Sequence, residues 1–221
     1  MQDKGQIAYE VIKKKIIEGE LAPLEDISEK QLQAELGTSR TPVHEALARL
    51  REENFVLTFP RKGTFVAELT LETVRAVYEM RLLNEPYLTG KAMERIPRDW
   101  LEDILRRLEN CPENLEPQER NVYFQKLDTE LHTTIVSYAD NVFLRNGLQN
   151  AYDHDRRIRI CRHKTPGHPD HIDISRQEHI CIVKAMLDGN GELVERLCRE
   201  HVAHSRDMLY EVMYEIPMGR V

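Results

Sequence analysis

Apolar residues recur at every third or fourth position along most of this 221-residue chain, which is the period of a helix with one buried face. The exception is segment 55–66, where two β-prone runs flank a turn at residues 60–63. The pattern therefore predicts a mainly α protein. Three helices and a small β-hairpin come first, and an antiparallel all-α bundle of six helices follows.

The ends of the expected helices follow from capping residues and from breaks such as Pro97, Asp140-Asn141 and the glycines near residue 190. The first helix is expected over 5–18, and Thr70 caps the first helix of the bundle. The bundle helices are expected over 70–94, 99–110, 117–138, 141–163, 173–188 and 190–215. The short link Glu68-Leu69 divides the chain into two predicted domains, 1–68 and 69–221.

Segment 28–50 has the pattern of two short helices joined by a tight turn. Ser28 and Gln31 have the spacing of a reciprocal capping box, and Gly37 tolerates the left-handed conformation that ends a helix. The apolar residues of the second helix share one face: Val43, Ala46, Leu47 and Leu50. Its other face holds side chains of types that reach phosphates and base edges from a helix-turn-helix: Arg40, Thr41, His44 and Arg51.

Paired amphipathic helices around a glycine also occur in many helical domains that bind no DNA, so the helix pair alone leaves both interpretations open. The hairpin that follows carries two cations, Arg61 and Lys62, and then Gly63 at its tip. A winged helix uses such a tip to enter or flank the minor groove. Three helices followed by a basic hairpin indicate an N-terminal winged helix-turn-helix that binds double-stranded DNA.

The charge balance limits how this binding works. The formal net charge is −7, and the first 68 residues are also slightly acidic, so locally placed cations must carry DNA binding, and salt is expected to weaken it. The run Lys13-Lys14-Lys15 either contacts phosphate or, more often for such runs, forms a solvated face. No apolar run approaches the ~20 residues of a membrane span, and the first residues do not resemble a signal peptide. We expect a cytoplasmic protein with free thiols and no membrane partner.

Histidines supply the candidate chemistry of the bundle. Asp128 and His132 are four residues apart and point the same way on a helix, while His179 and His201 lie on two later helices amid apolar neighbours. One carboxylate and three imidazoles that converge in a bundle would bind a divalent transition metal such as Zn, Ni or Mn. The competing interpretation is a set of hydrogen-bonded core histidines, and His204 is an alternative ligand. 

Another histidine, His154, stands between two aspartates. It either lines a cavity in the bundle or faces water.

The helix pair and hairpin resemble the GntR family of bacterial transcription regulators, and its FadR-type subgroup in particular. The resemblance rests on S-R-T-P-V at 39–43, on E-A-L at 45–47 and on Ser28-Glu29, with Leu36-Gly37 and Gly63 in register. It implies that Lys30, Arg40, His44 and Gly63 approach DNA. That family usually has arginine at the position of His44, and often glycine at that of Asn54. With their neighbours, the candidate DNA-contacting residues are Lys30, Ser39, Arg40, Thr41, His44, Arg51, Lys62 and Gly63.

The bundle resembles the FCD ligand-binding domain of the same subgroup. The metal-binding members of that family have their ligands at the positions of Asp128, His132, His179 and His201, so the resemblance implies a bound metal. It further implies that a small carboxylate or sugar-acid effector fills the open coordination positions, and that Arg81 in the E-x-R segment 79–81 clamps its carboxylate. Arg81 is equally consistent with a salt bridge on the helix surface.

The sequence thus predicts a homodimeric, ligand-responsive regulator, and in particular a repressor, that binds a palindromic operator. We expect no catalysis, because the chain has no H-E-x-x-H or comparable motif that carries a general base. Two alternatives remain open. An Asp/His₃ metal site can activate water, which would make the bundle a metal-dependent enzyme, or the metal ion can itself be the signal.

Overall fold

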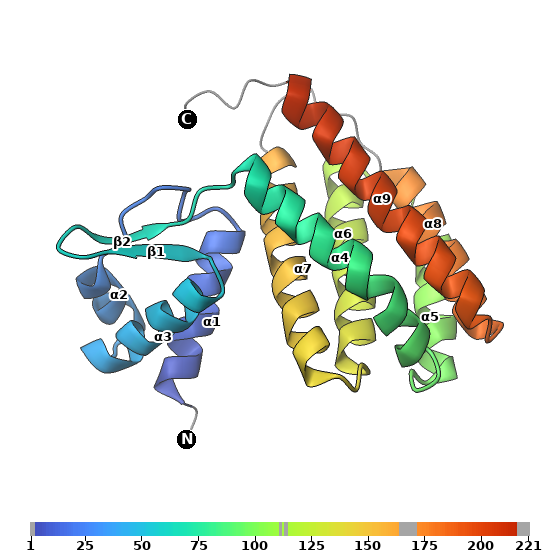
Figure 1. Ribbon diagram of the computed structural model, residues 1–221, viewed down its shortest axis with the longest axis horizontal. Coiled ribbons are helices and arrows are strands. Elements are labelled where there is room, and N and C mark those ends of the chain that lie inside the picture. The colour runs from blue at the N-terminus through green and yellow to red at the C-terminus, as the bar shows by residue number, and fades with distance from the viewer. Residues whose placement is uncertain (1–2, 111, 113–114, 164–171, 216–221) are drawn as a thin grey trace. The chain divides into compact units, whose positions relative to one another are not determined.

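The computed structural model describes residues 3–110, 112, 115–163 and 172–215. These residues form nine helices and one two-stranded antiparallel sheet, which confirms the predicted mainly α class (Figure 1). No helix among them has the length and apolar character to cross a membrane. By internal contacts the chain divides into a first unit, 1–74 with 153–166, and a second unit, 75–152 with 167–221. The two predicted domains remain a prediction, because two helices, over 71–92 and 142–163, each belong partly to both units.

The first unit begins with three helices and the hairpin. Its elements are α1 (Lys4–Ile17), α2 (Glu29–Leu36), α3 (Arg40–Glu52), β1 (Val56–Phe59) and β2 (Gly63–Val66). The helices and the inner face of the hairpin enclose one apolar core, since apolar side chains from all five elements are buried together. The core includes Ile12, Ile16, Leu32, Val43, Leu47, Leu50, Phe55, Val56 and Val66.

The turns of this unit use residues that suit their backbone. Ser28 Oγ accepts a hydrogen bond from the Gln31 amide at 3.3 Å, as predicted for the cap of α2. Gly37 ends that helix at φ +56°, in the left-handed region. Asn54 precedes the hairpin at φ +64°, and asparagine tolerates this conformation better than most residues. Ser39 occupies the N-cap of α3, but its side chain makes no capping bond.

The second unit is built from the six predicted bundle helices. Their observed ends lie within two residues of the expected ones, and Thr70 caps the first by accepting a hydrogen bond from the Thr73 amide at 3.1 Å. The predicted break at residues 166–169 lies outside the described residues. α8 packs against α5, α6 and α9 over a continuous apolar core. The helices are α4 (Leu71–Ala92), α5 (Arg98–Glu109), α6 (Pro117–Ser137), α7 (Val142–His163), α8 (Ile172–Leu187) and α9 (Gly191–Glu215).

The second half of α7 is part of the first unit. Lys13 Nζ lies 2.8 Å from Glu53 Oε2 and 2.6 Å from Asp153 Oδ2, so a mostly buried lysine joins α1, the residue after α3 and α7. Lys13 is therefore not part of a solvated lysine face. The His154 ring stacks on Phe55 with centroids 4.0 Å apart, and its Nε2 lies 2.8 Å from the Glu53 carbonyl oxygen. His154 is buried in this unit, which corrects both expectations for it.

Two further residues of α7 also contact other parts of the first unit. The Arg157 side chain is buried and donates to the Ala67 carbonyl oxygen, and Ile160 packs against the apolar core of the first unit. Burial lowers the pKa of Lys13, but Asp153 and Glu53 outweigh that effect and raise it above its usual value. The lysine therefore stays charged between two carboxylates, which is how a buried charge is tolerated.

Candidate DNA-reading face and metal centre

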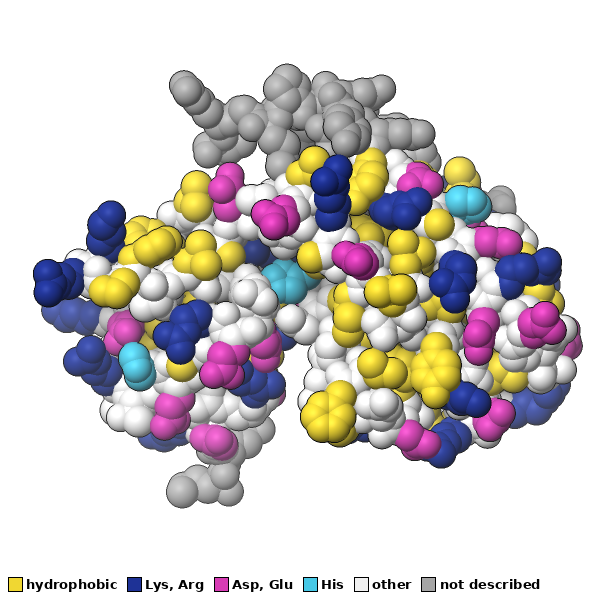
Figure 2. All heavy atoms as spheres, viewed as in Figure 1, with side chains coloured by type: hydrophobic (Ala, Val, Ile, Leu, Met, Phe, Trp, Pro, Cys, Tyr) yellow, Lys and Arg dark blue, Asp and Glu magenta, His cyan; other side chains and the backbone are white. Residues whose placement is uncertain are grey.

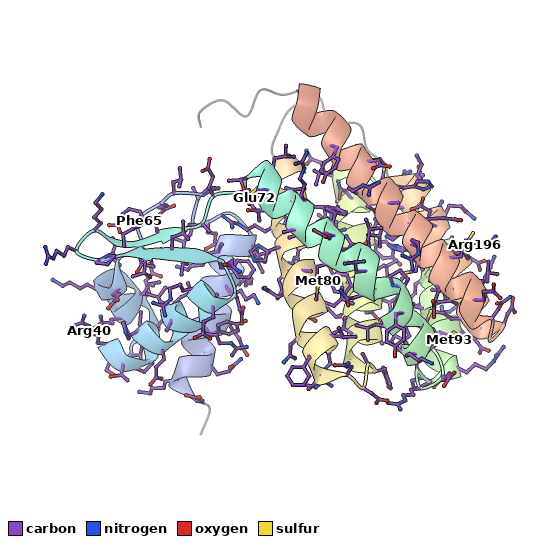
Figure 3. All side chains as sticks on the ribbon, in the orientation of Figure 1. Arg40, Phe65, Glu72, Met80, Met93 and Arg196 are labelled. Carbon is purple, nitrogen blue, oxygen red and sulfur yellow. The ribbon has the colours of Figure 1, made fainter. Side chains whose placement is uncertain are left out.

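The first unit separates a buried face of α3 from an exposed one. Every predicted DNA-contacting residue has an exposed side chain or, for Gly63, an exposed backbone. Arg40 lies in the first turn of α3 and is labelled in Figure 3. Figure 2 shows Lys and Arg side chains gathered around the hairpin end of this unit, with one histidine and a few acidic side chains among them. A net acidic chain thus displays several cations around this hairpin.

Glu29, the first residue of α2, lies against two of these side chains. Its Oε2 is 3.4 Å from Arg40 Nε, and its Oε1 is 3.6 Å from His44 Nδ1. Sequence reasoning missed Glu29 as a participant in this face. The available signal is Glu29 itself, which enters the sequence prediction only through the family resemblance, as part of Ser28-Glu29.

The tip of the hairpin combines two cations with exposed apolar rings. Arg61 and Lys62 are exposed, and Gly63 has φ +117°, a conformation that other residues rarely adopt. Phe59 is about half exposed, and its ring lies 6.0 Å from that of Phe65, which Figure 3 labels on β2. The tip therefore has both the charge and the backbone freedom that a wing needs near DNA.

In the second unit, three histidines from three helices converge. His132 on α6, His179 on α8 and His201 on α9 are all buried, and one ligand nitrogen of each lies within 4.8 Å of the others. His179 Nε2 and His201 Nε2 are 3.2 Å apart. Asp128 Oδ1 lies 3.6 Å from His132 Nε2 and 3.8 Å from His179 Nε2. The structure thus brings the three predicted histidines into one group, and the fourth predicted ligand, Asp128, contacts two of them, His132 and His179.

The outer nitrogens of two of these rings face carboxylates. His132 Nδ1 is 3.2 Å from Glu85 Oε1, and His201 Nδ1 is 2.7 Å from Glu178 Oε2. The His201 contact is a hydrogen bond, and a metal-binding histidine commonly has its other ring nitrogen held by a carboxylate in this way. The His132 contact is an ion pair without hydrogen-bond geometry. Sequence reasoning missed both glutamates. Neither has a recognisable spacing to its histidine, because Glu85 lies on another helix and Glu178 faces the histidine of a later one.

His204 lies outside the inner group. Its Nδ1 is 2.5 Å from Glu178 Oε1, and its side chain is mostly exposed. The same carboxylate therefore holds a buried histidine with one oxygen and an exposed histidine with the other. This placement favours His201 over His204 as the inner donor from α9.

The charges around the cluster suit a cation. Burial lowers the pKa of His132, but the Glu85 and Asp128 carboxylates outweigh it and raise that pKa to about 9. Burial and the neighbouring His201 hold the pKa of His179 well below its usual value, so its ring is neutral. A buried carboxylate facing imidazole nitrogens is a donor set for Zn, Ni or Mn, and in a buried site such donors need a positive partner.

Arg81 is not on the surface of its helix. Its side chain is 3 % exposed, and its Nε donates to Glu85 Oε2 at 2.9 Å. The guanidinium also lies 5.3 Å from the centre of the Tyr78 ring and 5.4 Å from that of Tyr152. The Tyr152 ring is in turn 4.8 Å from the His132 ring. The predicted surface salt bridge is therefore wrong, and Arg81 sits in a buried polar group next to the histidines.

Two family models cover most of the chain. The model described as "Bacterial regulatory proteins, gntR family" matches residues 4–66, and the FCD domain model matches residues 76–204. The helix-turn-helix repressor RspR of Escherichia coli (strain K12) is 22% identical over 214 residues, which are 97% of this chain and 92% of RspR. The Nta operon transcriptional regulator of Aminobacter aminovorans is 28% identical over 196 residues, 86% of this chain and 87% of that protein.

Solved structures agree in fold. E. coli McbR/YncC superimposes with a TM-score of 0.73 at 19% identity, over 96% of this chain and 99% of that chain. A GntR regulator from Rhodococcus sp. RHA1 gives a TM-score of 0.71 at 18% identity, over 95% and 99%. The FCD match alone spans more than half of the chain, and the helix-turn-helix match accounts for the first unit's helices and hairpin. The chain belongs to the gntR family of bacterial regulatory proteins and is a DNA-binding transcriptional regulator with a C-terminal FCD domain.

Proposed function

We propose that this regulator is a homodimeric repressor whose binding to a palindromic operator changes when a small carboxylate or sugar acid binds at a metal in the FCD domain. The observation that carries the proposal is the convergence of Asp128 and three histidines in a buried group that also contains Arg81. Operator DNA lies in the bacterial cytoplasm, so we place the protein there. Several named relatives act as repressors, RspR and the gluconate operon repressor of Bacillus subtilis among them.

The DNA-binding half of the proposal rests on α3 and the wing. Arg40 and His44 are one helical turn apart and exposed, so both face away from the core of the first unit. Arginine binds guanine through two acceptors in the major groove, while Lys30 and Lys62 suit phosphates. Ser39, Thr41, Arg51 and Gly63 complete the contact set.

The dimer is supported by apolar side chains that α4 leaves exposed. Leu83 is 67% exposed and Tyr87 is 48% exposed, and four residues of separation place them on one face. Exposed apolar neighbours of this kind mark contact surfaces. A second copy of the chain would cover them, and a two-fold dimer matches a two-fold operator.

The metal would be held by Asp128, His132, His179 and His201. When bound, it offers open coordination positions to an anionic oxygen. Glu85 and Glu178 orient the His132 and His201 rings, and Glu85 also holds the Arg81 guanidinium in place. A fixed guanidinium binds a carboxylate in bidentate geometry, which gives an organic acid a second anchor. The chemistry of the site therefore favours a small anion.

The same contacts argue against an enzyme. Glu85 is engaged by Arg81 and His132, and Glu178 by His201 and His204. These two glutamates are thus committed to ion pairs, and we assign the third carboxylate, Asp128, to the metal, whereas a general base must be able to take a proton from water or substrate. 

Helix α7 offers a route by which the effector alters DNA binding. Tyr152 packs on His132 in the second unit, and the next two residues, Asp153 and His154, hold Lys13 and Phe55 in the first unit. A helix transmits displacement along its axis because its hydrogen-bond ladder is stiff. Effector binding that moves Tyr152 would therefore also move Asp153 and His154 and their contacts in the DNA-binding unit. This coupling requires that the DNA-binding and the released conformations of the protein bind the effector with different affinities.

For DNA reading, we predict that Arg40→Ala lowers discrimination between operator and scrambled DNA by about tenfold or more, the range expected when one bidentate base contact is lost. The operator probe is a duplex that the wild-type protein selects from a random pool, and fluorescence anisotropy gives both affinities. Metal content should not change. Lys14→Ala, at an exposed position of α1, is the control and should leave discrimination intact.

For the metal, we predict that Asp128→Asn lowers affinity by more than about 100-fold, since the loss of an outer partner alone costs about 10- to 100-fold. This substitution keeps the shape of the side chain and removes its charge. Metal retained after dialysis is measured by inductively coupled plasma mass spectrometry. His204→Ala should keep its metal, and equal loss in both variants would contradict the assigned set.

For the effector, a thermal-shift screen against small carboxylic and sugar acids, with and without chelator, should find an acid that raises the melting temperature only when metal is present. Ligand at about 100 times its Kd adds roughly 2.7 kcal/mol of stability, a shift of several degrees at this chain length. Arg81→Met should abolish the shift. The acid should be recovered unchanged, because turnover would indicate an enzyme. A large drop on chelation with no response to any acid would make the metal itself the signal.

For the coupling, we predict that Asp153→Asn reduces the effect of the identified acid on operator affinity by at least about threefold, while acid binding and DNA binding each persist. The substitution removes one of the two carboxylates that hold Lys13. Anisotropy with and without the acid measures the effect. Asn146→Asp changes the charge by the same magnitude with opposite sign, at an exposed position on the same helix, and is the control. An unaltered response to the acid in Asp153→Asn would exclude this route.

A further inference from the structure

The acidic side chain on the DNA-reading face needs an explanation. Glu29 stands among the cations that approach DNA, and a carboxylate there repels phosphates of every sequence. By itself it therefore lowers affinity for operator and non-operator DNA alike. Because this repulsion is the same for every DNA sequence, it suggests a compensating gain in discrimination between the operator and other DNA.

We propose that Glu29 is a positioning residue for DNA reading, whose carboxylate fixes Arg40 and His44 in the orientation that discriminates the operator. The inference rests on the proposed reading role of those two residues. Each carboxylate oxygen serves one of them, Oε2 toward Arg40 Nε at 3.4 Å and Oε1 toward His44 Nδ1 at 3.6 Å.

The placement of Glu29 makes it an effective anchor. It opens α2 directly after the Ser28 cap, where the helix dipole favours a negative charge. Its side chain is 27% exposed, against 78% for Arg40 and 68% for His44. The Glu29 carboxylate is thus less exposed than the two side chains that it contacts. Because Arg40 and His44 are one turn apart on the same face of α3, one carboxylate reaches both.

The nearest atoms leave other groups available for DNA. Arg40 approaches Glu29 through Nε, so its terminal Nη atoms, which a guanidinium uses on guanine O6 and N7, are not the ones nearest the carboxylate. His44 approaches Glu29 through Nδ1, so Nε2 is likewise not the nearest atom. An untethered arginine samples many rotamers and must lose that freedom on binding. A tether formed before binding reduces this loss for the correct base and leaves non-specific phosphate contacts unaffected.

The test compares the selected operator with a scrambled duplex at fixed salt. Glu29→Gln removes the charge and keeps the shape of the side chain. We expect it to raise affinity for scrambled DNA by about twofold or more, as phosphate repulsion disappears. Discrimination should nevertheless fall by about three- to tenfold, because the reading side chains lose their anchor. Glu29→Asp keeps the charge but shortens the reach, so it should lower discrimination without raising affinity for scrambled DNA.

A matched control separates orientation from charge. Glu35 lies on the same helix and pairs with Lys15 of α1, away from α3. Glu35→Gln should change both affinities by the same factor and leave discrimination intact. If Glu29→Gln also changes both affinities equally, Glu29 acts only as a charge and the proposal fails. Thermal melts establish that each variant is folded.

A double-mutant cycle identifies the partner. In the Arg40→Ala background, the effect of Glu29→Gln on discrimination should shrink to the part that acts through His44. A full effect in that background would overturn the proposal, since Glu29 would then act without Arg40. If Arg40→Ala alone leaves discrimination unchanged, the proposed reading role of Arg40 fails. If Arg40→Ala lowers discrimination while Glu29→Gln does not, only the positioning role of Glu29 fails.

Discussion

The stability of the second unit depends on how its buried charged side chains are paired. A carboxylate and three imidazoles inside a helical bundle are destabilising unless each finds a partner of opposite charge or a hydrogen bond. Glu85 supplies much of that compensation, because it pairs with Arg81 on its own helix and with His132 on α6. Burial raises the pKa of Glu85, yet Arg81 and His132 outweigh it and hold that pKa well below its usual range. One buried glutamate therefore contacts both the Arg81 guanidinium and the His132 ring.

The sequence predicts which of these residues share a helix face, but it does not predict which helices bring them into contact. A spacing of four residues fixes Asp128 and His132 on one face of a helix, and the apolar period predicts the helices themselves. Arg81 and Glu85 have the same spacing, but an ion pair four residues apart is usually a surface feature. Nothing in their spacing reveals that α4 buries this pair against the ring of His132.

Helix α7 illustrates the same limit. Its period predicts one continuous helix, and the structure confirms it, but periodicity does not say that the helix serves two units. Neither alternative for Lys13, phosphate contact or a solvated face, and neither alternative for His154, a bundle cavity or water, matches the structure. Neighbours in sequence do not reveal that α7 meets the first unit at these two residues. In the structure they meet through Glu53, whose side chain binds Lys13 and whose carbonyl oxygen contacts His154.

The DNA-reading face follows a related principle, because a chain of formal net charge −7 cannot rely on general attraction to DNA. Few cations face the duplex, so the orientation of each has a large influence on which sequence is bound. Glu29 adds a repulsive charge to that face and at the same time contacts Arg40 and His44. If Arg40 and His44 read DNA as proposed, weaker binding to all DNA together with oriented reading groups would favour release from wrong sites more than from the operator. In both units, then, a partly or fully buried glutamate contacts the side chains that we assign to ligand binding.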